Sequence, residues 1–567
     1  MRKFSEEDLP LQWMYRWEAE RAGRIFLTQP FDGGKIREWT WTEAVGEVRR
    51  MAAYLKAQNW EPGSRVAILS RNCAWWIMAD LAIWMAGYVT VPIYPSLKAQ
   101  TIRQILEHSD SKACFVGATD DKDIVASGIP RDVATIALPT EMAGIYPTWD
   151  ELISGRAPLA GCPTRPGNDP ATIIYTSGTT GMPKGVKHCF AALAYDAMSL
   201  CGLLGLTAEE RVLSYLPLAH IVERAGLECT TLFLGSRFFF TEGIDTFLAD
   251  LNYAKPTIFV TVPRLLLKFQ QGVFAKFPKE KLERLLRIPI LNRSVKKRIL
   301  RKLGLATVKY AACGAAPLSP EILTWYRNVG LNLAEGYGMT ETLITHLPGV
   351  GGVRPGYVGR AMDGVETKIS ENDELLIRSP MNLLGYHKDP EGTAASFTPD
   401  GFFRTGDVAQ IDADGQLRII GRIKEQFKTS KGKYVAPAPI ESQLSSHPDV
   451  EACCLMGAGL PSPFAVVVLN EEARKRCIQG PQRVALEESL KHQMDLMNSE
   501  LDPHERVKFL AVVEGPWTIG NGVMTPTLKI KRTVVEGRYQ SFVEDWYVQQ
   551  RPVVWEEAER RGLGAGG

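Results

Sequence analysis

The sequence has few of the cysteine or charge patterns that mark metal-binding, disulfide-rich or nucleic-acid-binding proteins. Its 10 cysteines form no C-x-x-C pair and no Cys/His cluster with zinc spacing. Lysine and arginine number 66 against 64 aspartates and glutamates, so the formal net charge of +2 argues against a nucleic-acid partner. Hydrophobic residues make up 45% and charged residues 23%, which excludes disorder on a large scale. Scattered single cysteines instead fit a reducing, cytoplasmic compartment.

Long hydrophobic runs are also scarce. The N-terminus lacks the apolar stretch of a secretory signal. The most apolar window, residues 74–94, contains Asp80 and ends in the strand-like sequence YVTVPIY. This window predicts a buried helix followed by a strand rather than a membrane span. We therefore expect a cytoplasmic protein.

The first part of the chain alternates helix and strand patterns. A helix that Thr42 can cap precedes the apolar run 66–69, and further strand candidates lie at 113–116 and 256–260. Ser96 and Ser319 can each start a further helix. Helices that alternate with short apolar strands predict an α/β fold with parallel sheets and helices on their faces.

After about Gly356 the pattern changes to short alternating strands separated by turn residues. This change predicts a small β-rich, barrel-like subdomain at about 356–421 that follows two αβ subdomains at about 1–355. A mixed region follows it, and we expect the glycine-rich end after Arg561 to be disordered. There is no internal repeat.

Residues 175–185 read YTSGTTGMPKG and follow the apolar pair Ile173-Ile174. Glycines let a backbone approach a phosphate closely, hydroxyls donate to it, and Lys184 adds a cation. The usual P-loop requires Gly-Lys-Ser/Thr, whereas Pro183 precedes the lysine here. A Gly/Thr/Ser segment alone is usually a turn, but ten ordered positions ending in Pro-Lys-Gly favour a polyphosphate loop.

This segment resembles the signature loop of the adenylate-forming superfamily, which includes acyl-CoA synthetases, peptide-synthetase adenylation domains and firefly-type luciferases. The resemblance implies that ATP and a carboxylate give an acyl-adenylate and pyrophosphate, after which a thiol displaces AMP. Further segments match the family in order, from residue 91 to Arg532, so the resemblance covers nearly the whole chain.

The segment 335–342 (EGYGMTET) resembles the family's second signature. By resemblance, Tyr337 stacks on adenine, Thr340 contacts the α-phosphate and Glu341 binds magnesium. Residues 314–317 (GAAP) resemble the adenine loop, and Asp407 in 404–407 (RTGD) resembles the ribose-binding aspartate. An aromatic face suits a purine and a carboxylate suits a hard cation or two hydroxyls.

The segment 421–425 (GRIKE) resembles the family's hinge. The resemblance places a hinge at 422–424, with Arg422 reaching the nucleotide and Lys424 as the pivot. It implies that a small mobile α+β domain follows at 425–550 and a tail at 551–567. The segment 525–532 (TPTLKIKR) resembles the one that carries the adenylation lysine, which by position is Lys529 rather than Lys531. Its charge would offset the negative charge of the transition state.

Residues 215–224 (YLPLAHIVER) and 428–434 (KTSKGKY) resemble the long-chain fatty acyl-CoA synthetase branch. By resemblance, His220 lies near the carboxylate, whereas Glu223 and Arg224 can be interpreted as a partly buried ion pair. Lys431 departs from the branch, which commonly has glycine at that position in the loop that lines the CoA passage.

The resemblance thus implies an AMP-forming fatty acid:CoA ligase, with a long-chain acid, ATP and coenzyme A as substrates and Mg²⁺ as cofactor. The catalytic candidates are Lys529, His220, Lys184 and Glu341. The metal candidates are Thr176 and Glu341, and the CoA-side loop is Lys431, Gly432 and Lys433. The ATP/AMP candidates are Thr176, Ser177, Gly178, Thr179, Thr180, Gly181, Gly314, Ala315, Ala316, Gly336, Tyr337, Gly338, Met339, Thr340, Asp407, Arg422 and Lys529.

Several alternatives remain open. They are an acyl-AMP ligase that loads a carrier protein or an amine, a CoA ligase for aromatic or medium-chain acids, a luciferase-type oxidation, and a non-catalytic nucleotide-binding protein. The oligomeric state stays open between monomer and homodimer. The basic stretch 293–302 fits either a solvated helix face or a surface for peripheral contact with an anionic bilayer.

Overall fold

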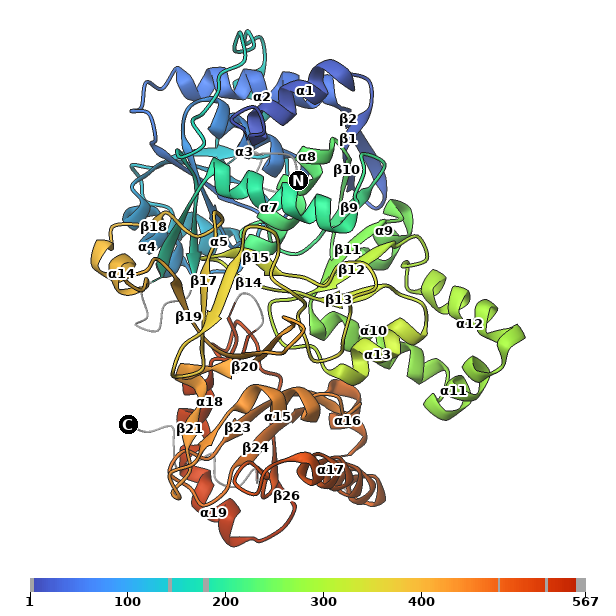
Figure 1. The fold of residues 1–567 in the computed structure, drawn as a ribbon. Helices are drawn as coiled ribbons and strands as arrows, with labels where there is room; N and C mark the ends of the chain where they lie inside the picture. The colour runs from blue at the N-terminus through green and yellow to red at the C-terminus, as the bar shows by residue number, and fades with distance from the viewer. Residues whose placement is uncertain (1–4, 141–144, 177–182, 478–479, 526–528, 557–567) are drawn as a thin grey trace.

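The computed structural model describes residues 5–140, 145–176, 183–477, 480–525 and 529–556. It has a large N-terminal domain and a smaller C-terminal domain, which lies below it in Figure 1. The predicted glycine-rich end lies outside the described residues, as does most of the predicted phosphate loop.

The first sheet of the large domain has seven strands in the order β18-β8-β7-β4-β3-β5-β6. The strands from β7 to β6 run parallel, and β8 and β18 add an antiparallel edge. Their bounds are β3 Arg65–Leu69, β4 Val89–Ile93, β5 Ser111–Val116, β6 Ala134–Ala137, β7 Pro170–Thr176, β8 Lys184–Cys189 and β18 Gly385–Tyr386. The predictions of strands at 66–69 and 113–116 are confirmed.

The second sheet has the order β13-β12-β11-β9-β10-β1-β2 and is parallel from β13 to β1. Its strands are β1 Ile25–Phe31, β2 Lys35–Thr40, β9 Arg211–Ser214, β10 Arg237–Phe240, β11 Ile258–Thr261, β12 Tyr310–Cys313 and β13 Leu333–Glu335. Two parallel sheets with helices on their faces confirm the predicted fold class.

Helices cover both sheets (Figure 1). They are α1 Pro10–Glu20, α2 Trp41–Lys56, α3 Ala74–Met85, α4 Ala99–Ser109, α5 Lys122–Gly128, α6 Trp149–Ile153, α7 Phe190–Leu204, α8 Thr230–Leu234, α9 Phe247–Ala254, α10 Pro263–Lys276, α11 Lys279–Arg287, α12 Pro289–Lys302 and α13 Pro320–Asn328. The segment η1, Val222–Cys229, is a π-helix.

The apolar window at 74–94 forms the buried helix α3 and the strand β4, as predicted. All residues of α3 are buried, including Asp80. In the described part of the chain, no helix has both the length and the apolar character needed to cross a membrane.

Two predicted helix starts were wrong. The side chain that caps α2 is Thr40, which exchanges hydrogen bonds with Glu43 in a capping box, so Thr42 lies inside the helix. The helix expected from Ser96 begins at Ala99. The predicted start at Ser319 is confirmed, since its side chain accepts a hydrogen bond from the Ile322 N–H.

The β-rich region contains the antiparallel sheet β16-β17-β19-β20. Its bounds are β16 Glu366–Ile369, β17 Glu374–Arg378, β19 Phe403–Ile411 and β20 Leu417–Arg422, with the hairpin β14 Tyr337–Met339 and β15 Leu343–His346 before it and α14 Pro390–Ala395 within it. The strand β18 leaves this region to pair with β8, which ties it to the first sheet.

The C-terminal domain is built on the sheet β23-β24-β25-β26. Its elements are η2 Ile423–Glu425, β21 Phe427–Lys428, β22 Tyr434–Val435, α15 Pro437–Leu444, β23 Val450–Met456, β24 Phe464–Leu469, α16 Glu471–Arg476, α17 Pro481–Glu500, β25 Leu510–Val513, α18 Arg532–Tyr539, η3 Gln540–Phe542, α19 Val543–Val548 and β26 Val553–Trp555. Because β26 pairs with β25, the sheet extends past residue 550, where the prediction ended this domain.

Candidate functional site

The predicted phosphate loop joins two neighbouring strands. Thr176 at the end of β7 and Lys184 at the start of β8 are paired across the antiparallel ladder, so the two ends of the segment lie side by side. Its candidates Ser177, Gly178, Thr179, Thr180 and Gly181 lie outside the described residues. At the strand itself, a Cβ on Gly185 would lie 2.9 Å from Cγ2 of Ile173, so this position leaves no room for a side chain.

Tyr386 of β18 links two of the predicted catalytic residues. The ammonium of Lys184 lies 4.8 Å from the centre of its ring, a cation–π contact. The Tyr386 hydroxyl donates a hydrogen bond of 3.1 Å to the Glu341 carboxylate. Burial raises the pKa of Glu341, while this hydrogen bond and the charge of Arg422 lower it. Sequence reasoning missed Tyr386, because its role depends on the β18–β8 pairing.

Tyr337, Asp407 and Arg422 form one polar cluster. The Tyr337 hydroxyl donates to Asp407 at 2.5 Å, and the Arg422 guanidinium pairs with the other carboxylate oxygen at 2.8 Å. Asp407 and Arg422 are register partners on β19 and β20, whereas Tyr337 comes from β14. Burial raises the pKa of Asp407, and the charge of Arg422 lowers it. The structure therefore brings together three candidates from separate segments of the sequence.

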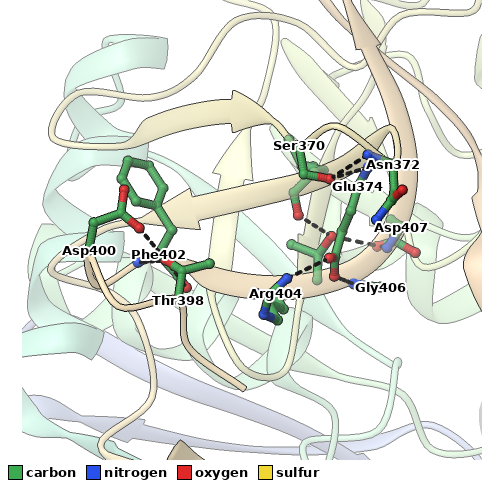
Figure 2. Close-up of polar contacts among 11 residues, drawn as sticks. Ser370, Asn372, Glu374, Thr398, Asp400, Phe402, Arg404, Gly406 and Asp407 are labelled. Atoms are coloured by element: carbon green, nitrogen blue, oxygen red, sulfur yellow. Dashed lines mark hydrogen bonds and ion pairs between the residues drawn. The ribbon is translucent and has the colours of Figure 1, made fainter. Parts of the chain in front are cut away.

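Glu374 holds the irregular part of β19 that carries Asp407 (Figure 2). One of its oxygens accepts a 3.0 Å hydrogen bond from the Gly406 N–H, and the other lies 3.3 Å from the Arg404 guanidinium. Thr405 donates to the Leu375 carbonyl at 2.7 Å and accepts from the Asp407 N–H at 3.1 Å. Gly406 has a φ of +70°, a conformation that favours glycine. Nothing local in the sequence indicated the role of Glu374.

The two predicted adenine segments lie side by side. The Gly336 N–H donates to the Cys313 carbonyl at 2.9 Å, and Gly314 follows directly. A Cβ on Gly338 would lie 2.2 Å from the Leu343 carbonyl oxygen, so the β14–β15 hairpin requires glycine there. Ala315 has a φ of +67°. Small residues thus keep this edge of the site open.

The remaining candidates of these segments are Ala316, Met339 and Thr340. Ala316 follows Ala315 in the same loop, and Met339 ends β14. The Thr340 carbonyl is 2.6 Å from Nε2 of buried His188, a contact that anchors the turn between β14 and β15.

Lys529 of the C-terminal domain lies within range of the charges of the Tyr337–Asp407–Arg422 cluster. It is exposed to solvent, and its backbone N–H donates to the Thr525 hydroxyl at 3.0 Å. The surrounding protein and the charge of Arg422 lower the pKa of Lys529, whereas the carboxylates of Asp407, Glu425 and Glu341 raise it. Lys529 is therefore within electrostatic range of the predicted nucleotide residues.

His220 lies just before the π-helix η1. Burial, together with the charge of Lys529, lowers its pKa to about 4, so its imidazole is neutral near pH 7. Its Nδ1 accepts a 3.3 Å hydrogen bond from the Val222 N–H, which leaves the proton on Nε2. His220 is thus a neutral hydrogen-bond donor.

An apolar cavity adjoins the cluster and opens to solvent; the space between its lining residues, including the part open to solvent, is about 1040 Å³. The cavity runs between α7 and η1 on one side and β11 and β12 on the other. Its lining includes Leu200, Leu204, Ile221, Val222, Gly226, Leu227, Ile258, Val260, Ala311, Gly314, Ala315, Gly336, Tyr337, Ile344 and Val353. The cavity therefore ends at the predicted adenine segments. The hydrophobic periodicity of the sequence did not reveal it, because its walls are distant in sequence.

A buried ionic cluster connects η1 to α3. Arg224, with 0% of its side chain exposed, pairs with Asp80 of α3 at 2.8 Å and with Glu228 at 3.0 Å. The interpretation of Glu223 and Arg224 as an ion pair was wrong, because Glu223 instead accepts a 2.6 Å hydrogen bond from Ser214. The π-helical geometry changes which side chains share a face, and α-helical spacing could not predict it.

Lys424 of the predicted hinge and the CoA-side loop lie outside the cluster. Lys424 is exposed in η2, which directly follows β20. Lys431, Gly432 and Lys433 form an exposed turn closed by a 2.9 Å hydrogen bond from the Thr429 N–H to the Lys433 carbonyl. Among the described residues, no polar contact joins this turn to the large domain.

Comparisons with known proteins agree with this arrangement. The AMP-binding enzyme family matches residues 14–387, and its C-terminal domain matches residues 424–551. A long-chain-fatty-acid–CoA ligase, FadD15 of Mycobacterium bovis, is 31% identical over 96% of this chain and 97% of its own length.

Solved structures show the same fold. The adenylation domain of a carboxylate reductase from Mycobacterium chelonae superimposes with a TM-score of 0.81 at 23% identity, covering 95% of this chain and 91% of that one. The anthranilate CoA ligase AuaEII, in complex with anthranoyl-AMP, gives a TM-score of 0.77 at 21% identity, covering 94% of this chain and 99% of that one. This chain belongs to the AMP-binding, adenylate-forming enzyme family and is similar to its long-chain acyl-CoA synthetases.

Proposed function

We propose that the protein activates a long-chain fatty acid with ATP, releasing pyrophosphate, and transfers the acyl group to coenzyme A with release of AMP. One observation carries the proposal: the apolar cavity ends at the glycine segments that also border the Tyr337–Asp407–Arg422 cluster. An acid whose chain fills the cavity would present its carboxylate to a nucleotide bound at the cluster. The names of relatives such as the M. bovis ligase support a fatty acid and CoA as substrates.

For the nucleotide, the proposal assigns the ribose hydroxyls to Asp407. An ionised carboxylate can accept about four hydrogen bonds, and Tyr337 and Arg422 use two of them. The ring of Tyr337 offers a face to adenine, and Lys184 at the end of the predicted phosphate loop offers a cation to the outer phosphates. Thr340 is assigned to the α-phosphate.

Hard oxygen donors fit a magnesium ion here. Glu341 keeps an oxygen beyond the one that accepts from Tyr386, and Thr176 ends β7 beside the phosphate loop. Such a small ligand set suits Mg²⁺, which is usually bound by one or two carboxylates together with substrate phosphates. When bound, the ion would neutralise charge on the triphosphate.

Lys529 and His220 would act on the reacting carboxylate. The Nε2–H of neutral His220 can donate to a carboxylate oxygen and orient it without titrating near pH 7. The Lys529 ammonium would stabilise the negative charge that develops as that oxygen attacks the α-phosphate. Transfer to CoA would then follow a rotation about Lys424 that replaces Lys529 with another face of the C-terminal domain.

A panel of acids from acetate through aromatic acids to long fatty acids, with ATP–pyrophosphate exchange and CoA-dependent AMP release as readouts, tests the proposal. We expect both activities to be highest with long-chain acids. Exchange without CoA-dependent AMP release would point to an acyl-AMP ligase with a carrier or amine acceptor. A preference for aromatic acids would refute the long-chain assignment, and no exchange with any acid would refute adenylation itself.

A further inference from the structure

The helices α11 and α12 form an arm at the edge of the large domain, beside α10 and α13 (Figure 1). Between residues 279 and 302 the sequence has ten lysines and arginines against two glutamates. The region therefore carries a formal charge of +8, whereas the whole chain carries only +2. Such a concentration creates a local positive field even when the whole chain is nearly neutral.

One side of α12 carries the cations. Arg293, Lys297 and Arg301 recur every four residues and therefore share a side of the helix, and Arg298 and Lys302 lie next to them. All five are exposed. None of them pairs with a carboxylate within the part of the chain that the structure describes. We call these five residues the α12 basic face.

The opposite side of the arm is anchored in the core. Leu282 of α11 and Ile299 of α12 are buried, at 2% and 7% exposure. Ile299 belongs to the same apolar cluster as Ala311 and Cys313 of β12, and these two also line the apolar cavity. The buried residues thus attach the arm to the sheet that forms one wall of the cavity.

Apolar side chains are exposed where the two helices meet. Ile288 and Leu291 each leave 43% of their surface in contact with solvent. Leu291 lies seven residues before Arg298, so it extends the same side of α12. Cations beside exposed aliphatic side chains, with no aromatic ring between them, suit the boundary between lipid headgroups and acyl chains better than a nucleic acid.

We propose that the α12 basic face, with Ile288 and Leu291, docks the protein on an anionic lipid bilayer. Lipid headgroup phosphates would contact the cations, and the two aliphatic side chains would enter the headgroup boundary. The binding is independent of catalysis. Its use, to collect an apolar acid from the bilayer that holds it, rests on the proposed function.

Flotation of the full-length protein with vesicles tests the proposal without turnover. We expect binding to vesicles of phosphatidylcholine with phosphatidylglycerol, little binding to phosphatidylcholine alone, and weaker binding at high salt. The triple variant Arg293→Glu, Lys297→Glu and Arg301→Glu should lose roughly 100-fold in partitioning, from about fivefold for each cation lost.

A matched control changes the same total charge elsewhere. Lys112, Arg131 and Arg360 are exposed and lie outside the arm, so their triple change to glutamate should retain most of the binding. The double variant Ile288→Ser and Leu291→Ser should weaken the binding that persists at high salt. Circular dichroism melting must show all variants folded.

Three results would overturn the proposal. The first is equal binding to neutral and anionic vesicles, and the second is an equal loss in the control variant. The third is binding of duplex DNA that is tighter than binding of vesicles and that is lost in the triple variant. That result would reassign the face to nucleic acid. Absence of ligase activity would refute the proposed function but leave these vesicle results in force.

Discussion

Gly226 in the π-helix η1 is expected to limit the length of the acid that the apolar cavity accepts. A Cβ at this position would lie 2.9 Å from Cδ1 of Ile344, and both residues line the cavity. A larger side chain at Gly226 must therefore occupy the cavity or push Ile344 into it. We expect Gly226→Leu to shorten the acids that the enzyme prefers.

The magnitude follows from the volume lost. A leucine side chain adds four carbons and displaces about four methylenes of substrate, each worth about 0.8 kcal/mol of burial. The loss of about 3 kcal/mol corresponds to roughly 200-fold in kcat/KM for acids that fill the cavity. Acids too short to reach Gly226 should keep their kcat/KM.

The assay is CoA-dependent AMP release over a homologous series of saturated acids. Gly202→Leu is a matched control, because Gly202 lies on the exposed side of α7 and a Cβ there would have no heavy atom within 4 Å. An unchanged acid profile in Gly226→Leu would refute the assignment of the cavity to the acyl chain. An equal loss for short and long acids would indicate damage to the site instead.

Three further predictions concern charge. Arg224→Met should lower the free energy of unfolding by about 3–5 kcal/mol, because it leaves the Asp80 and Glu228 carboxylates buried without their cation. Adding Asp80→Asn and Glu228→Gln should restore most of this loss, and urea titration measures both changes. Lys529→Ala should slow pyrophosphate exchange by on the order of 100-fold while thioester formation from a preformed adenylate is largely retained in stopped-flow assays. Asp196→Asn should make the melting temperature fall less between about pH 4 and pH 7, because it removes a buried group that titrates in this range.

Burial raises the pKa of Asp196 to about 7, above its ordinary value of about 4. The folded state keeps a proton that the unfolded state has lost between these values, so stability is full below about pH 4 and falls as pH rises through 7. Its Oδ1 accepts from the Ile344 N–H, and asparagine can keep that bond. Identical pH profiles for Asp196→Asn and the parent would contradict this account.

For Lys529, exposed Lys531→Ala is the control, and equal losses in both half-reactions would contradict the separate role of Lys529.

The sequence predicted elements whose signals are local. The strands at 66–69 and 113–116 and the buried helix at 74–85 follow from apolar runs bounded by turns. The start of α2 was missed although its signal is local: Thr40 and Glu43 have capping-box spacing, whereas three residues after Thr42 stands Val45, which cannot complete the box.

The site was predictable only as far as motifs reached. Tyr337, Asp407 and Arg422 were named from three separate segments, and the structure brings them into contact. Tyr386 and Glu374 were missed, because each acts across a strand pairing that no local pattern specifies. The same holds for the cavity, whose walls come from segments distant in the chain.

The contact between Asp407 and Arg422 connects the proposed nucleotide site to the domain boundary. Arg422 ends β20 and stands two residues before Lys424, and its guanidinium fixes one oxygen of the carboxylate proposed to hold ribose. Because Arg422 precedes Lys424 and is the register partner of Asp407 in the large-domain sheet, a rotation at Lys424 would leave this 2.8 Å ion pair in place. The domains themselves meet through polar contacts, the Arg264–Glu451 ion pair at 2.6 Å and a 2.9 Å hydrogen bond from Gln271 to the Pro448 carbonyl. Polar interdomain contacts exchange readily with water, so movement of the C-terminal domain would withdraw Lys529 while the Tyr337–Asp407–Arg422 cluster stays intact.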